Sequence, residues 1–87
     1  MTATTIDVTV RYFAAARAAA GVETEVVAIA AGATVTDLVT ALRTRDATLA
    51  GVLDRCSFLC DGIAVRDHGK RLQTNQTLDV LPPFAGG

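Results

Sequence analysis

Hydrophobic and polar residues alternate near the start of the chain, which is typical of a β-strand buried on one side. In the segment IDVTVRYF, four residues share one face: Ile6, Val8, Val10 and Tyr12. Phe13 departs from the pattern, because it is a large apolar residue on the otherwise polar face. It is therefore either covered by the segment that follows or exposed for a partner.

The residues that follow predict a helical connection and then a second strand. The run AAARAAAG favours one or two helical turns, and Gly21 is a residue that commonly ends a helix. The segment VETEVVAIA resumes a β-rich pattern. We therefore expect the two strands to form a hairpin with a long connection.

The strongest helical pattern lies in GATVTDLVTALRTR. Its apolar residues recur at i, i+3, i+4 and i+7 and make one stripe: Val35, Leu38, Val39 and Leu42. Thr34 or Thr36 can cap the N-terminus, where Asp37 also suits the positive end of the helix dipole. We expect this helix to cover one face of a sheet. The segment DATLAGVLDR predicts a short second helix or a packed loop.

The last third of the chain returns to strands. In SFLCDGIAV, the pair Asp61-Gly62 between β-rich runs predicts a tight hairpin. TLDVLP is the last strand, and Pro82-Pro83 ends it because proline cannot donate to a ladder. The elements indicate an α+β roll: a mixed sheet of about five strands, one main helix across one face and a short second helix.

Composition narrows the class of protein. The chain has 87 residues, 51% of them hydrophobic and 20% charged, which excludes disorder, and no apolar run has the length of a membrane helix. The net charge of -1, with scattered Lys and Arg, argues against nucleic acid or an anionic membrane as a partner. No secretory signal is visible, so we expect a cytoplasmic protein.

Few side chains suggest an enzyme site. The glycine-rich phosphate loop is absent, and the carboxylates are scattered on surface-like positions. We expect His68 to be exposed in a polar connection. Cys56 and Cys60 lack enough neighbouring ligands for a zinc site, so we expect them to be reduced, partly buried thiols.

The segment PPFAGG suits a terminus that is presented to another protein. Pro82 and Pro83 favour a stiff, extended course, and six extended residues reach roughly 20 Å. Gly86 and Gly87 have no Cβ, so they can lie in a narrow groove and leave the terminal carbonyl open to attack. A terminal carboxylate becomes reactive once it is activated, for example as an acyl-adenylate made with ATP. Phe84 would anchor the segment in the partner.

These features resemble the MoaD branch of the ubiquitin-like sulfur carriers, a family that also includes ThiS. The resemblance spans nearly the whole chain and rests on four features: VRYFAAARAAAG, TVTDLVTALRTR, the turn at Asp61-Gly62, and LDVLPPFAGG. It implies a β-grasp, ubiquitin-like domain over residues 1–81 and a flexible tail over residues 82–87.

The resemblance also implies a function, that of the small subunit of molybdopterin synthase in molybdenum cofactor biosynthesis. Gly87 would be adenylated by a MoeB-type enzyme that uses ATP, and then converted to a thiocarboxylate. Its sulfur would pass to precursor Z, cyclic pyranopterin monophosphate, inside a MoaE-type large subunit, in a heterotetramer of two small and two large chains. The small subunit would bind no cofactor and supply no catalytic site other than this sulfur donor.

Matching positions assign roles to residues near the tail. Phe13 and Leu81 would belong to the partner surface. The tail inserted into the partner would consist of Pro82, Pro83, Phe84, Ala85 and Gly86, followed by Gly87.

Other functions use the same tail chemistry or none of it. The chain could carry sulfur for thiazole or cysteine synthesis, or be a ubiquitin-like modifier conjugated to lysines. A β-grasp binding module, in which the two glycines have no role, is the reading from a different class. Partner identity and deletion of Gly87 separate these possibilities.

Overall fold

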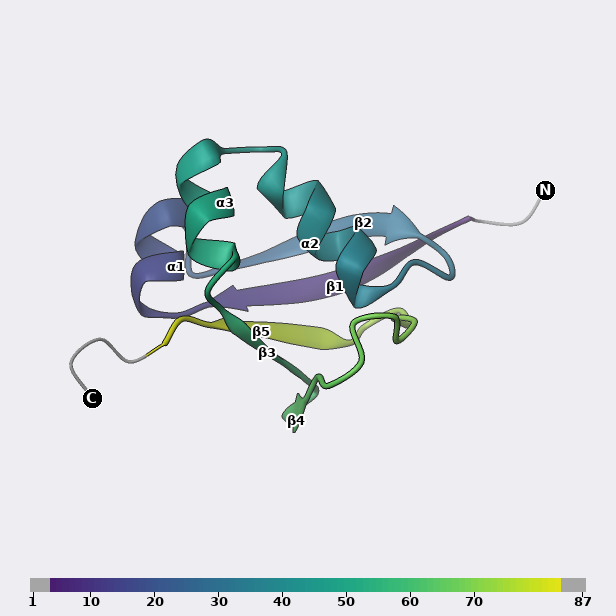
Figure 1. Cartoon of the computed structure of the whole chain (residues 1–87). Helices are drawn as coiled ribbons and strands as arrows, with labels where there is room; N and C mark the ends of the chain where they lie inside the picture. Colours follow the sequence, from purple (N-terminus) through teal and green to yellow (C-terminus); the bar gives the residue numbers. More distant parts are fainter. Residues whose placement is uncertain (1–3, 84–87) are drawn as a thin grey trace.

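The computed structural model describes residues 4–83, which form one mixed sheet with helices on one side (Figure 1). The five strands are β1 (Thr5–Tyr12), β2 (Thr24–Ala30), β3 (Ser57–Cys60), β4 (Ile63–Ala64) and β5 (Thr77–Leu81). The three helices are α1 (Ala14–Ala20), α2 (Val35–Arg43) and α3 (Ala47–Leu53). The α+β roll expected from the sequence is confirmed.

The sheet has the order β2-β1-β5-β3-β4. The central pair β1 and β5 is parallel, and every other neighbouring pair is antiparallel. Strands from the two ends of the described chain thus lie side by side and run in the same direction (Figure 1). Consequently, the residues that follow β1 and β5 leave the sheet at the same end.

The core lies between the helices and one face of the sheet. Side chains of β1 alternate as expected, with Val8, Val10 and Tyr12 buried on the helical side. The helices contribute buried leucines and small residues: Ala16, Val35, Leu38, Leu42, Leu49 and Leu53. In the described part of the chain no helix covers the other face of the sheet, which we call the open face (Figure 1).

Local sequence explains how α2 begins. Thr34 accepts a hydrogen bond from the Asp37 N–H at 3.2 Å, and the Asp37 carboxylate accepts one from the Thr34 N–H at 2.9 Å. This reciprocal pair is a capping box, which satisfies two N–H groups that the helix itself leaves without partners. Of the two candidate caps, Thr34 is the cap, while the Thr36 hydroxyl donates to the His68 carbonyl.

The alanine run forms the predicted short helical connection as α1, so residues 4–83 contain three helices, one more than the main helix and short second helix of the expected roll. Gly21 ends α1 in the left-handed region, with φ 79°, and its N–H donates to the Arg17 carbonyl. The predicted hairpin is also present: Asp61 and Gly62 both have positive φ, 49° and 83°, between β3 and β4.

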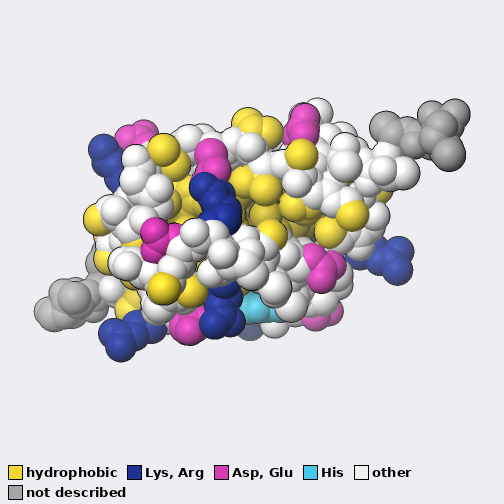
Figure 2. Space-filling model, turned by 90° about the horizontal axis from the view of Figure 1, so that it is seen from above, with side chains coloured by type: hydrophobic (Ala, Val, Ile, Leu, Met, Phe, Trp, Pro, Cys, Tyr) yellow, Lys and Arg dark blue, Asp and Glu magenta, His cyan; other side chains and the backbone are white. Residues whose placement is uncertain are grey.

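Viewed from above the helices, hydrophobic side chains gather along the middle of the surface, while charged side chains are scattered around and across them (Figure 2). Within residues 4–83, no helix has the length and apolar character needed to cross a membrane.

Candidate functional site

The parallel pair brings Phe13, Leu81 and the start of the tail to one end of the sheet. Tyr12 pairs with Val80 in the β1–β5 register, so the residues that follow them, Phe13 and Leu81, occupy corresponding positions. The Phe13 N–H donates to the Val80 carbonyl at 3.2 Å, which ties the end of β1 to β5. The side chains of Tyr12 and Val80 point into the core. Because successive side chains of a strand alternate between its two faces, those of Phe13 and Leu81 lie on the open face.

Phe13 is exposed, which settles the alternative left open by the sequence. Its side chain is 39% exposed, although it directly precedes α1. The Phe13 carbonyl accepts hydrogen bonds from the N–H groups of Ala16 and Arg17, so its backbone is fixed as the N-cap of the helix. Leu81 is half-buried beside β3. An apolar patch is therefore held rigidly at the end of the sheet from which the tail leaves.

Arg11 and Asp79 form an ion pair next to this patch. The Arg11 guanidinium donates from Nε and Nη2 to the two carboxylate oxygens of Asp79, at 2.6 and 2.8 Å. The Asp79 side chain is only 8% exposed, whereas that of Arg11 is 50% exposed. Hydrogen bonding to Asp79 raises the pKa of Arg11 above its usual value. The expectation that all carboxylates lie at the surface is wrong for Asp79.

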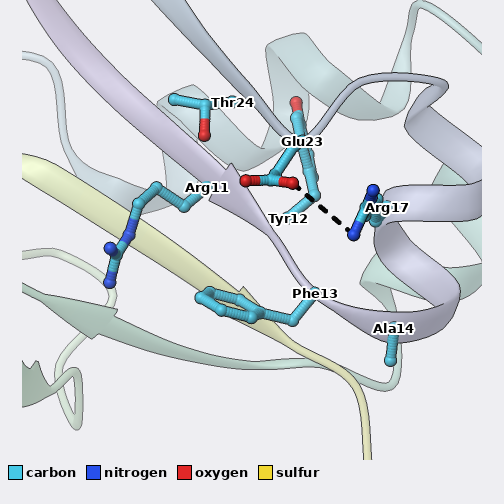
Figure 3. Close-up of a pocket in the computed structure, with 7 residues that line it drawn as sticks. All are labelled: Arg11, Tyr12, Phe13, Ala14, Arg17, Glu23 and Thr24. Carbon is cyan, nitrogen blue, oxygen red and sulfur yellow. Dashed lines mark ion pairs between the residues drawn. The ribbon is translucent and has the colours of Figure 1, made fainter.

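The same guanidinium also contacts Phe13. Its central carbon lies 5.5 Å from the centre of the Phe13 ring, within the range of a cation–π interaction. Figure 3 shows the side chains of Arg11 and Phe13 on the same side of β1. Arg11 thus links the buried carboxylate to the exposed ring, a role that the sequence did not reveal because Arg11 resembled an ordinary surface cation.

A small pocket of about 260 Å³ opens between the end of β1 and the start of β2 (Figure 3). Arg17 and Glu23 form an ion pair across it, with 3.5 Å between nitrogen and oxygen, and both side chains are largely exposed. Both arginines of the pocket already have acidic partners. The pocket contains no pair of groups suited to acid–base or nucleophilic chemistry. Its residues are Arg11, Tyr12, Phe13, Ala14, Arg17, Glu23 and Thr24.

A second hollow, of about 380 Å³, lies beside the first two residues of the tail, Pro82 and Pro83, which we call the tail base. Pro82 is half-buried and Pro83 is exposed, and both follow β5 directly. The hollow is lined by α1, α3 and the prolines: Ala15, Thr48, Gly51, Val52, Arg55, Pro82 and Pro83. The remaining tail residues named from the sequence lie outside the described residues: Phe84, Ala85, Gly86 and Gly87.

The other residues considered from the sequence lie away from this end or have structural roles. His68 is exposed, as expected, and its ring makes an edge contact with Phe58. Cys56 is half-buried and Cys60 buried, both as free thiols, and burial raises the pKa of each. Among residues 4–83, no group of His, Cys, Asp and Glu side chains is arranged to hold a metal ion.

The fold and the position of the tail base define a small ubiquitin-like protein of the β-grasp fold. The model of the ThiS family matches residues 10–87, so the chain belongs to that family, within the MoaD/ThiS group of ubiquitin-like sulfur carriers. No curated protein matches the chain.

Solved structures agree with this assignment. The HVO 2177 protein of Haloferax volcanii is 28% identical, with a TM-score of 0.86 over 100% of this chain and 92% of that chain. A candidate molybdopterin converting factor subunit 1 from Pyrococcus furiosus is 26% identical, with a TM-score of 0.82 over 91% of this chain and 99% of that chain. The small archaeal modifier protein 1 of Haloferax volcanii is 27% identical, with a TM-score of 0.81 over 93% of this chain and 99% of that chain.

Proposed function

We propose that the chain is the sulfur-carrying small subunit of a molybdopterin synthase. The observation that carries the proposal is the position of the tail base. Pro82 leaves the sheet at the end where exposed Phe13 and half-buried Leu81 offer an apolar contact. A partner that binds this patch receives the tail in a fixed direction, so one docking event can place Gly87 in the partner's cavity. Similarity to the Pyrococcus furiosus protein supports the choice of pathway.

The chemistry of the carrier is simple in this proposal. A MoeB-type adenylyltransferase transfers AMP from ATP to the carboxylate of Gly87 and releases pyrophosphate. A hydrosulfide ion then displaces AMP and leaves a thiocarboxylate, which is anionic at neutral pH and nucleophilic without help from the carrier's side chains. It donates sulfur to precursor Z, cyclic pyranopterin monophosphate, in the large subunit. The carrier itself binds no cofactor, because ATP is used by the activating enzyme.

The proposed partner is a MoaE-type large subunit, in a heterotetramer of two small and two large chains. A complex of subunits 1 and 2 of the molybdopterin-converting factor from Helicobacter pylori has a chain with this fold, at a TM-score of 0.71 and 21% identity. We place the reaction in the cytoplasm, where thiols such as Cys56 and Cys60 stay reduced.

A second candidate function is conjugation to lysines of other proteins. The similarity to small archaeal modifier protein 1 favours it, since the coverage and TM-score nearly equal those of the Pyrococcus furiosus protein. Both functions begin with adenylation of the tail and diverge at the acceptor, which is sulfur in one case and an amine in the other.

Intact mass spectrometry tests the proposal. The chain is incubated with ATP, a MoeB-type enzyme and a sulfur source, and replacing one oxygen by sulfur should add about 16 Da. A chain lacking Gly87 is the control and should gain no mass. Adding a MoaE-type subunit and precursor Z should then restore the original mass and yield the sulfur-containing pterin. Isopeptide adducts without pterin product would favour the modifier, and full pterin synthesis by the truncated chain would overturn the carrier function.

A further inference from the structure

The strand β2 forms one edge of the sheet and has a row of free backbone groups. The Tyr12 N–H donates to the Glu23 carbonyl at 2.9 Å, and the Ala31 N–H donates to the Thr4 carbonyl at 2.7 Å. Residues of an antiparallel strand alternate between bonding to one side and the other. Odd-numbered residues of β2 therefore bond to β1, and the even-numbered residues direct their N–H and C=O groups outward: Thr24, Val26, Ala28 and Ala30.

Nothing in the described part of the chain blocks this edge. Among residues 4–83, no strand lies beyond β2 in the sheet, and of the outward groups only the Ala30 carbonyl accepts a hydrogen bond, from the Ala33 N–H. The strand TEVVAIA contains no proline, no lysine and no bulge, which are the usual devices that keep edges from pairing. Val26 on this strand is 64% exposed. The opposite edge, β4, is only two residues long.

The charges of β2 suit pairing with a second copy of the same strand. Glu25 is the strand's one charged residue, and it lies near the N-terminal end. In an antiparallel pair centred on Val27, the residue numbers of paired positions sum to 54. Glu25 then faces Ile29 of the other copy, and Val26 faces Ala28. Like charges are kept apart, and all four outward-pointing residues fall in hydrogen-bonded pairs.

Other registers are less favourable. Registers whose paired numbers sum to an odd value would place outward groups opposite inward ones and remove the hydrogen bonds. Centring the pair on Val26 or Ala28 keeps the hydrogen-bonding pattern but pairs only five of the seven residues of β2, and centring it on Glu25 pairs only three. The register centred on Val27 is therefore favoured, because it alone pairs the whole strand in the two-fold way that an isologous interface requires.

We propose that this chain forms a homodimer through antiparallel β2–β2 pairing, which joins the two sheets into one. The two-fold axis passes between the paired Val27 residues, perpendicular to the sheet. Phe13 and Leu81 lie at the ends of β1 and β5 and not on β2, so they take no part in the pairing and their open face stays available. An interface of one short strand belongs at the lower end of specific interfaces, below about 1,200 Å² in total, so the dimer is reversible.

The test uses the chain alone, without enzyme or sulfur, so its outcome is independent of the carrier function. Sedimentation equilibrium over roughly 10 μM to 1 mM should show a monomer–dimer transition. Val26→Pro removes an outward N–H while leaving the bonds to β1 intact, and Val26→Thr keeps that N–H. The proline variant should weaken the dimer about tenfold or more, because two symmetry-related hydrogen bonds are lost, whereas the threonine variant should dimerise like the wild type.

A charge pair tests the register itself. Val26→Lys should weaken the dimer, because the two introduced ammonium groups become diagonal neighbours. Combining Val26→Lys with Ala28→Glu places opposite charges face to face in the proposed register and should restore dimerisation. Both substitutions are at exposed positions, so these variants test dimerisation even if the proline variant fails to fold. A wild-type chain that stays monomeric at 1 mM, or a Val26→Lys variant that dimerises equally well, would overturn the proposal.

Discussion

Arg11 and Asp79 face each other on the parallel strands β1 and β5, and two hydrogen bonds of 2.6 and 2.8 Å join their side chains. Their positions lie 68 residues apart in the sequence. Asp79 is buried on the face of the sheet that the helices leave open, with Leu59 of β3 beside it on the other side. A charge can be buried there because the bidentate Arg11 satisfies both of its oxygens.

Removing Arg11 should therefore destabilise the protein more than removing a surface arginine. Arg11→Leu leaves a buried carboxylate without its partner, and we expect a clear drop in the urea midpoint of unfolding. Arg17→Leu is the matched control, because the pair with Glu23 is long and exposed, and its loss should change the free energy of unfolding by less than about 0.5 kcal/mol.

The double variant Arg11→Leu with Asp79→Leu completes this test. An apolar pair can replace a buried ion pair without a large loss, so the double variant should recover most of the stability lost in the single one. Equal instability of the single and double variants would show that the carboxylate is not what makes the loss of Arg11 costly.

Most elements of the fold could be predicted because they depend on local pattern. Alternation placed β1, the apolar stripe placed α2, and Asp61-Gly62 placed the hairpin of β3 and β4. The order of strands could not be obtained in this way. The pairing of β1 with β5 brings together segments from opposite ends of the chain, and no local pattern encodes that partnership.

The candidate site was predicted in part for the same reason. Phe13 was noticeable as an apolar residue on a polar face, and Leu81 followed from the family resemblance. Arg11 and Asp79 each resembled an ordinary solvent-facing charge, because their alternation within a strand is that of surface residues. Only the parallel register shows that they form a pair, whose guanidinium also contacts the Phe13 ring.

The capping box of α2 gives a prediction about helix stability. Thr34→Ala removes the acceptor for the Asp37 N–H and should cost about 1 kcal/mol of unfolding free energy. Thr40→Ala, on an exposed position within the same helix, is the control and should be neutral or slightly stabilising. Chemical denaturation monitored by circular dichroism measures both. A loss of equal size in the two variants would argue against the cap as its cause.

Tyr12 gives a prediction about alkaline pH. Its hydroxyl donates to Glu25 at 2.6 Å, and Arg45 donates to both oxygens of the same carboxylate. Burial, and then the hydrogen bond to Glu25, raise the pKa of Tyr12 well above its ordinary value of 10.0. Above about pH 10 the unfolded chain loses the phenol proton while the folded chain keeps it, so stability should fall as the pH rises and be unaffected below that range.

The chain contains one tyrosine and no tryptophan, so its ultraviolet absorbance reports this group directly. The folded protein should show no tyrosinate absorbance at pH values where denatured protein is ionised. Tyr12→Phe has no phenol to ionise, so its free energy of unfolding should fall less at alkaline pH than that of the wild type. A titration of the folded chain with a midpoint near that of free tyrosine would contradict the burial of the hydroxyl.

The two thiols should react slowly with alkylating agents. Burial raises the pKa of both Cys56 and Cys60, so little thiolate is present at neutral pH. Cys56 is half-buried, and its Sγ donates to the Val52 carbonyl at 3.1 Å, whereas Cys60 is buried in the core. We expect iodoacetamide to modify Cys56 first and both more slowly than glutathione, as followed by intact mass. Faster labelling of Cys60 would indicate that β3 opens readily.

The patch beside the tail base should matter for partners and little for folding. Phe13→Ala removes an exposed ring whose backbone role as the N-cap of α1 does not depend on its side chain, so the unfolding midpoint should change little. Binding to a MoaE-type subunit, measured by calorimetry, should weaken about tenfold or more, as for other aromatic residues at the centre of an interface. Ile63→Ala is the control, because Ile63 is also apolar and 69% exposed but lies on β4, at the far edge of the sheet from β1. If both variants bind equally well, the partner does not use this patch, and the tail alone must account for recognition.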